Sequence, residues 1–135
     1  MEVNLNLGIS CSDMLKMKRN SVIQIATAED KTVLENVIIA DTFYLRLKGL
    51  MGKKTLNEQQ GLLIKPCNSI HTFFMKMNID IAFLDKENTI VALYKDMRPW
   101  KISKIHINSN FVIEGNSGSL SELKIGDKIK IVNKA

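Results

Sequence analysis

The chain has 135 residues, of which 45% are hydrophobic and 24% are charged, and this composition excludes collagenous and disordered proteins. The net charge of +5 is spread along the chain and aromatic residues make up only 6%, so we do not expect a nucleic-acid partner. No stretch approaches the roughly 20 apolar residues that cross a bilayer, and we expect no membrane partner.

The two cysteines, Cys11 and Cys67, allow at most one disulfide within the chain, which is too few for a secreted scaffold held by disulfides. We therefore expect a cytoplasmic protein. Residues 7–11 resemble a lipoprotein cleavage site, but the acidic, asparagine-containing start of the chain does not form a signal peptide. Residues 1–20 carry little apolar surface, so we interpret them as an N-terminal extension that precedes a single domain at 21–135.

The first part of the domain predicts a hairpin and then a helix. Residues 21–27 and 32–40 are rich in β-branched side chains and flank a polar turn, which is typical of two antiparallel strands. Residues 41–52 change the period: Asp41 or the next residue can cap a helix, apolar side chains recur at i, i+4 and i+7, and Gly52 ends the pattern.

The remaining elements are short strands. Residues 61–65 form an apolar run that stops at a proline. Residues 79–94 predict a hairpin with its turn at 86–88, and residues 110–114 and 128–132 predict two further strands. This pattern favours a mostly β fold, α+β at the margin, in which an antiparallel barrel-like sheet carries one flanking helix.

The segment from Pro66 to Asp85 holds the candidate site. Asp80 lies inside an apolar run, and burying its carboxylate costs several kcal/mol unless partners compensate. Those partners can be backbone or hydroxyl groups near the start of a strand, which is a structural role. They can also be His71 or Arg46 in a pocket, which is a functional role.

Cys67 and His71 are four residues apart, a spacing that can hold zinc. An extended backbone would separate them by about 13 Å, and two ligands make only half a site, so we predict no metal and no cofactor. Cys67 is either a nucleophile activated by His71 or a buried, inert thiol. Both readings stay open from the sequence.

The chain resembles the family known as domain of unknown function 192, over residues 21–132. The resemblance rests on ADTFYLRLKGLMG, on SIHTFFMKMNIDIAFLD and on the later VIEGNSG and IGDKI. It departs from many relatives at 74–77, where they carry Trp-Met-Lys-Asn, and at 115–116, where they carry Ala-Gly. The resemblance implies a β-rich, barrel-like fold with a flanking helix and no established activity.

Our leading hypothesis is a non-catalytic domain that binds a small polar ligand or a peptide in a polar cleft. We expect the cleft to be lined by convergent groups of both charge signs beside an apolar wall, namely Arg46, His71, Thr72, Asp80 and Glu114. The alternative is a hydrolase or transferase that uses His71 with Asp80 or Cys67.

Overall fold

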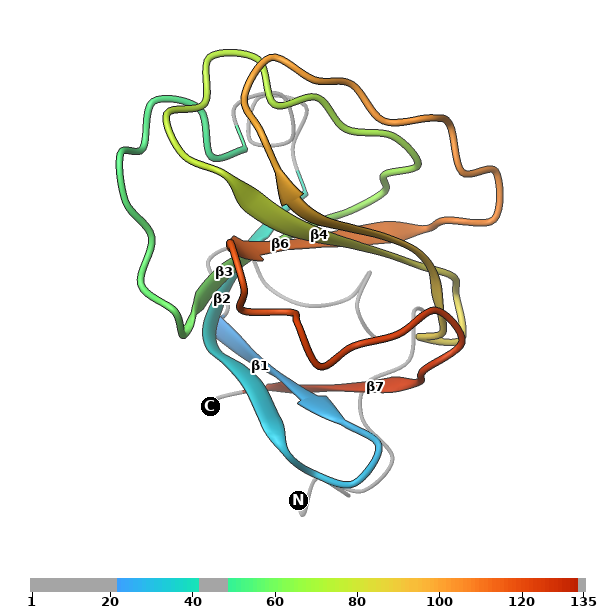
Figure 1. Ribbon diagram of the computed structural model, residues 1–135. Helices are drawn as coiled ribbons and strands as arrows, with labels where there is room; N and C mark the ends of the chain where they lie inside the picture. Colours follow the sequence, from blue (N-terminus) through green and yellow to red (C-terminus); the bar gives the residue numbers. More distant parts are fainter. Residues whose placement is uncertain (1–21, 42–48, 134–135) are drawn as a thin grey trace.

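The computed structural model describes residues 22–41 and 49–133, and its elements are all strands (Figure 1). The strands are β1 (Val22–Thr27), β2 (Thr32–Ala40), β3 (Gln60–Ile64), β4 (Ile79–Leu84), β5 (Ile90–Met97), β6 (Phe111–Asn116) and β7 (Ile129–Asn133). They form one sheet in the order β5-β4-β6-β3-β2-β1-β7. The prediction of a mostly β fold is confirmed.

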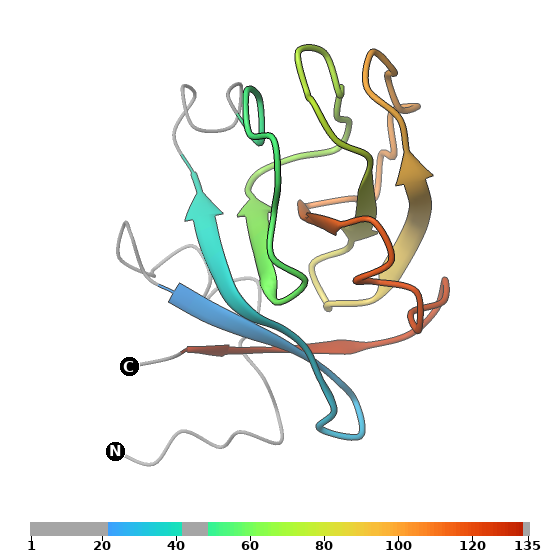
Figure 2. The ribbon, with the colours of Figure 1, turned by 60° about the vertical axis from the view of Figure 1, so that its left-hand side comes forward.

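The sheet curls into a half-barrel (Figures 1 and 2). In both views β1 and β7 turn away from the plane of β4, β5 and β6 and run below them. The two edge strands meet at one corner, where a bridge pairs Thr89 with Lys128 and the Ile90 amide donates to the Asp127 carbonyl at 2.9 Å. The barrel-like shape follows from this curl and this corner contact.

One strand pair corrects the prediction of an antiparallel sheet. β2 and β3 are parallel, in a register that runs from Asn36 opposite Gln60 to Ala40 opposite Ile64. Parallel neighbours need a long crossover, and residues 41–59 supply one. The predicted flanking helix falls largely on this crossover, and residues 42–48 lie outside the described part. Residues 49–52 form turns, and no helix occurs in residues 22–41 and 49–133.

Both faces of the central strands are buried, because side chains alternate between two cores. The inner core receives side chains from all seven strands, including Leu63, Ala82 and Ile113. The outer core lies on the other face and includes Ile81 and Phe83, together with residues of the connections. All six residues of β4 are buried as a result.

A layer of two connections covers the outer face, and we call it the loop layer. It consists of residues 65–78 and 98–110, which lie side by side at the top of both ribbon views. Backbone hydrogen bonds join the two segments, among them Ser103 N–H to the Ile70 carbonyl and His106 N–H to the Asn68 carbonyl. The His106 ring packs on Phe83 with centroids 4.5 Å apart, so the layer is seated on the outer core.

Candidate functional site

Asp80 lies on β4 and points to the inner face, where it is 1% exposed. One carboxylate oxygen accepts the Asp96 amide at 2.8 Å, and the other accepts the amides of Gly118 and Leu120 at 2.9 and 3.1 Å. Three backbone donors therefore compensate the buried charge. The sequence left two kinds of partner open for this carboxylate, and the structure shows the backbone groups.

The bonds from Gly118 and Leu120 fix the turn that follows β6. Gly115 lies opposite Asp80, and a Cβ at this position would collide with the Ser119 hydroxyl, so a glycine lets the turn fold down over β4. The Ser117 hydroxyl donates to the Asp96 carboxylate at 2.6 Å. That bond, followed by one from the Asn78 amide, lowers the pKa of Asp96. The turn is thus attached to both β4 and β5.

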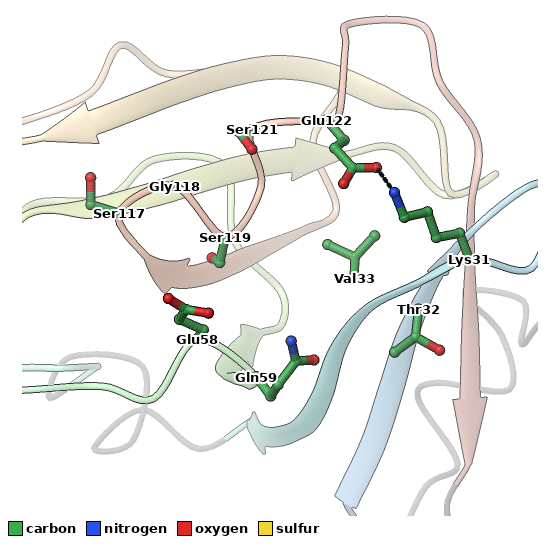
Figure 3. Close-up of a pocket in the computed structure, with 10 residues that line it drawn as sticks. All are labelled: Lys31, Thr32, Val33, Glu58, Gln59, Ser117, Gly118, Ser119, Ser121 and Glu122. Carbon is green, nitrogen blue, oxygen red and sulfur yellow. Dashed lines mark hydrogen bonds and ion pairs between the residues drawn. The ribbon is translucent and has the colours of Figure 1, made fainter.

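The turn forms one wall of a pocket with a volume of about 440 Å³ (Figure 3). The start of β2 and the residues before β3 form the other walls. The described residues that line it are Lys31, Thr32, Val33, Glu58, Gln59, Ser117, Gly118, Ser119, Ser121 and Glu122. The lining is polar, with two carboxylates, one ammonium group and several hydroxyls.

An ion pair closes one side of this pocket. Lys31 Nζ lies 2.6 Å from Glu122 Oε2, and both side chains are more than half exposed. A second pocket of about 270 Å³ lies beyond the pair and shares both residues with the first. Exposed ion pairs contribute little to stability, so this contact can open at small cost and join the two pockets.

The predicted residues His71 and Thr72 lie in the loop layer. Thr72 is fully buried; its hydroxyl donates to the Arg98 carbonyl at 2.7 Å and accepts the Lys101 amide at 2.9 Å. His71 is half-buried, and its Nδ1 accepts the Phe73 amide at 3.2 Å. Thr72 therefore joins the two segments of the layer to one another. The hydrogen bond of His71 orders its own segment locally. Arg46 lies outside the described residues.

Glu114 lies on β6 and points to the outer face, because its register partners Leu62 and Ile81 belong to the outer core. It is 1% exposed, and its Oε2 has no hydrogen-bond partner. Burial raises the pKa of this carboxyl to about 8. The side chain is therefore mainly a neutral acid at pH 7.

The predicted site residues that the structure describes do not converge on one cleft. Asp80 and Glu114 point to opposite faces, and His71 and Thr72 lie in the loop layer. The Cys67 thiol donates to the Ser69 carbonyl, with its Sγ 3.1 Å from that oxygen. Within residues 22–41 and 49–133, no three metal-ligating side chains converge and no helix could cross a membrane.

Sequence reasoning missed the polar residues that line the pocket of Figure 3. Lys31, Glu58 and Ser117 each fall in a stretch that reads as a turn or loop. The serines and glycines of 115–119 are a visible signal for a tight turn. No local pattern shows that this turn meets residues from near β2 and β3.

Comparison with known proteins places the chain among uncharacterised relatives. The model of the family DUF192, described as "Uncharacterized ACR", matches residues 23–131. A UPF0127 protein of Thermococcus sibiricus is 38% identical over 69% of this chain, which spans 64% of that relative's length. A UPF0127 protein of Pyrococcus horikoshii is 38% identical over 70% of this chain and 85% of its own length.

One similar solved structure is a protein of unknown function from Novosphingobium aromaticivorans. It matches with a TM-score of 0.69 at 18% identity, over 81% of this chain and 83% of its own. At this identity the likeness shows the fold alone.

Proposed function

We propose that this chain, which belongs to the uncharacterised family DUF192, is a non-catalytic domain that binds a small polar ligand or a peptide end in the pocket of Figure 3. One observation carries the proposal: two backbone hydrogen bonds to Asp80, from the amides of Gly118 and Leu120, hold the wall of the pocket in a defined shape. A rigid wall lowers the entropy lost on binding. The volume of about 440 Å³ falls in the range of small-molecule sites.

The charges of the lining favour a ligand that carries an amine and hydroxyl or amide groups. Glu58 and Glu122 outnumber Lys31, whose own charge is paired with Glu122. Hydroxyl and amide groups of Thr32, Ser121 and Gln59 can order such a ligand through hydrogen bonds. The free N-terminus of a peptide has the same chemistry as a small amine.

The lining also supports binding over catalysis. Among the residues that the structure describes, the lining contains no histidine and no cysteine, and the Ser117 hydroxyl is engaged with Asp96. The enzyme alternative needs His71 beside Asp80 or Cys67, and both oxygens of Asp80 are taken by backbone amides. We also propose that the protein is located in the cytoplasm.

A thermal-shift screen of small amines, amino acids, polyols and short peptides with free N-termini tests this function. We expect at least one compound to raise the melting temperature and to shift the amide NMR resonances of Lys31, Gln59 and Gly118. Glu58→Gln should weaken binding a few-fold, since it removes one carboxylate from the lining. Glu87→Gln, at an exposed turn outside the pocket, is the matched control.

Two results would overturn the proposal. The first is that no compound in these classes stabilises the protein. The second is that the resonances that respond to a stabilising compound belong to residues outside the pocket lining.

A further inference from the structure

We infer that the outer surface of the loop layer is a docking surface for membranes that contain anionic lipids. Five large apolar side chains are exposed there: Phe74, Trp100, Ile102, Ile105 and Ile107. Ile107 is 88% exposed. Such a group on one side of a globular domain marks an interaction surface.

In the segment 98–110, polar side chains face the protein and apolar side chains face outward, which is the reverse of an ordinary surface loop. From Ser103 onward every third residue turns toward the protein, and these residues are Ser103, His106 and Ser109. The isoleucines between them point outward. Since the fold buries the hydroxyls and exposes the aliphatic groups, the outward apolar side chains are not explained by packing within the domain.

The two exposed aromatic residues are held at a conformational cost. Phe74 and Trp100 have φ angles of 64° and 65°, in the left-handed region that bulky residues rarely adopt. Their rings contact one another with centroids 4.8 Å apart, and both are more than half exposed. Strain of this kind persists where the surrounding structure imposes it, and it clusters at functional surfaces.

The charge of the loop layer favours an anionic partner. The two segments of the layer contain no aspartate or glutamate, and they expose Lys76, Arg98, Lys101 and Lys104. Basic residues around protruding apolar side chains are the pattern of proteins that adsorb to anionic bilayers. Three of the five apolar residues are isoleucines, which have no π-face for stacking on nucleobases, so a bilayer fits better than a nucleic acid.

Peripheral adsorption needs no spanning segment. The sequence-based expectation of no membrane partner rests on the absence of an apolar stretch long enough to cross a bilayer. A layer that inserts a few side chains at the interface buries them among headgroups while the backbone hydrogen bonds of the layer stay intact.

The single tryptophan of the chain makes the test direct, because all tryptophan fluorescence reports on Trp100. With vesicles of equal parts phosphatidylcholine and phosphatidylglycerol, we expect the emission to move to shorter wavelength and brominated lipid to quench it. Vesicles of phosphatidylcholine alone should bind much more weakly, and salt should weaken binding to the mixed vesicles.

Variants that keep Trp100 separate the contributions of the apolar and of the basic side chains to vesicle binding. Ile105→Ser with Ile107→Ser should lower the vesicle partition coefficient at least about tenfold, because two aliphatic side chains no longer insert. Lys101→Gln with Lys104→Gln should lower it about 25-fold, at roughly fivefold per lysine. The matched controls are Ile125→Ser and Lys124→Gln, exposed residues in a loop that packs on the inner core.

All of these residues are exposed, so the melting temperature should stay the same throughout. The inference is wrong if the mixed vesicles leave the emission unchanged, or if the control variants lose as much binding as the loop-layer variants. A shift produced by a single-stranded oligonucleotide and not by vesicles would also overturn it.

Discussion

Asp80 on β4 and Glu114 on β6 are one residue out of register, and their buried carboxyl groups therefore lie on opposite faces of one sheet. Asp80 is opposite Gly115, whereas Glu114 is opposite Ile81. The first carboxylate has three backbone donors and orders a turn. The second has an oxygen with no partner. Two acids at similar depth thus have different roles, set by the donors within reach.

Asp80→Asn should destabilise the protein by about 3 kcal/mol. Backbone amides occupy both oxygens of Asp80, so the amide nitrogen of an asparagine would face a donor in either orientation. Asp85 is the matched control, because a single oxygen, Oδ1, accepts both of its backbone amides and an asparagine retains that oxygen. Urea unfolding measures both variants; equal losses would contradict the argument.

Glu114→Gln should stabilise the protein more at pH 8 than at pH 5. The pKa of Glu114 is about 8 in the folded state against an ordinary value of 4.5. Between these values the folded protein keeps a proton that the unfolded chain has released, so the free energy of unfolding falls as pH rises through this window. The slope approaches about 1.4 kcal/mol per pH unit, and glutamine removes it.

Urea titrations of the wild type and Glu114→Gln at several pH values measure that slope. We expect the difference between the two proteins to grow steadily from pH 5 to pH 8. A difference that does not change with pH would mean that burial has not displaced the pKa of this carboxyl.

Gly115→Ala and Ser119→Ala should be coupled. An alanine Cβ at 115 would collide with the Ser119 hydroxyl but would lie 3.6 Å from the Ser119 Cβ, which is ordinary contact. That hydroxyl is buried without a hydrogen-bond partner, so Ser119→Ala alone should be neutral or stabilising. The double variant should then recover most of the melting temperature lost by Gly115→Ala.

Gly61→Ala is the control for this double-mutant cycle. Its Cβ would lie 2.8 Å from the backbone carbonyl of Glu114 and 2.7 Å from a Leu34 methyl group, and neither contact involves Ser119. Ser119→Ala should therefore not rescue it. Rescue of both glycine variants to the same degree would disprove the proposed contact.

Phe74→Gly should cost less stability than Phe73→Gly. Glycine relieves the left-handed strain at Phe74, worth about 1 kcal/mol, whereas Phe73 has no positive φ and is less exposed. Thermal unfolding measures the difference. If the loop layer docks on membranes, Phe74→Gly should also weaken vesicle binding. A larger loss of stability at Phe74 would show that its ring is needed for packing.

The elements with local signals are the ones that can be predicted from the sequence. The β1–β2 and β4–β5 hairpins follow from β-branched runs around polar turns, and the burial of Asp80 follows from its apolar neighbours. β6 extends past the strand predicted at 110–114, because Gly115 still pairs with Asp80 and with Gly61. That pairing is between distant segments, and no local pattern encodes it.

Contacts between distant segments are also the reason why the rest of the site could not be predicted. The parallel pairing of β2 with β3 and the meeting of Lys31, Glu58 and Ser117 at one pocket depend on how the crossover returns. The sequence indicates that Asp80 needs partners, but it does not show that two of them are amides from a turn 38 and 40 residues later. Binding residues that sit in turns carry weak signals of their own.

The pairing of β1 with β7 has a consequence for synthesis of the chain. β1 emerges from the ribosome early, and one edge of it stays without its partner until β7 has been made. An unpaired strand edge can pair with other chains and so promotes aggregation. The nascent protein is thus expected to depend on chaperone protection, or on fast translation, for as long as that edge is open.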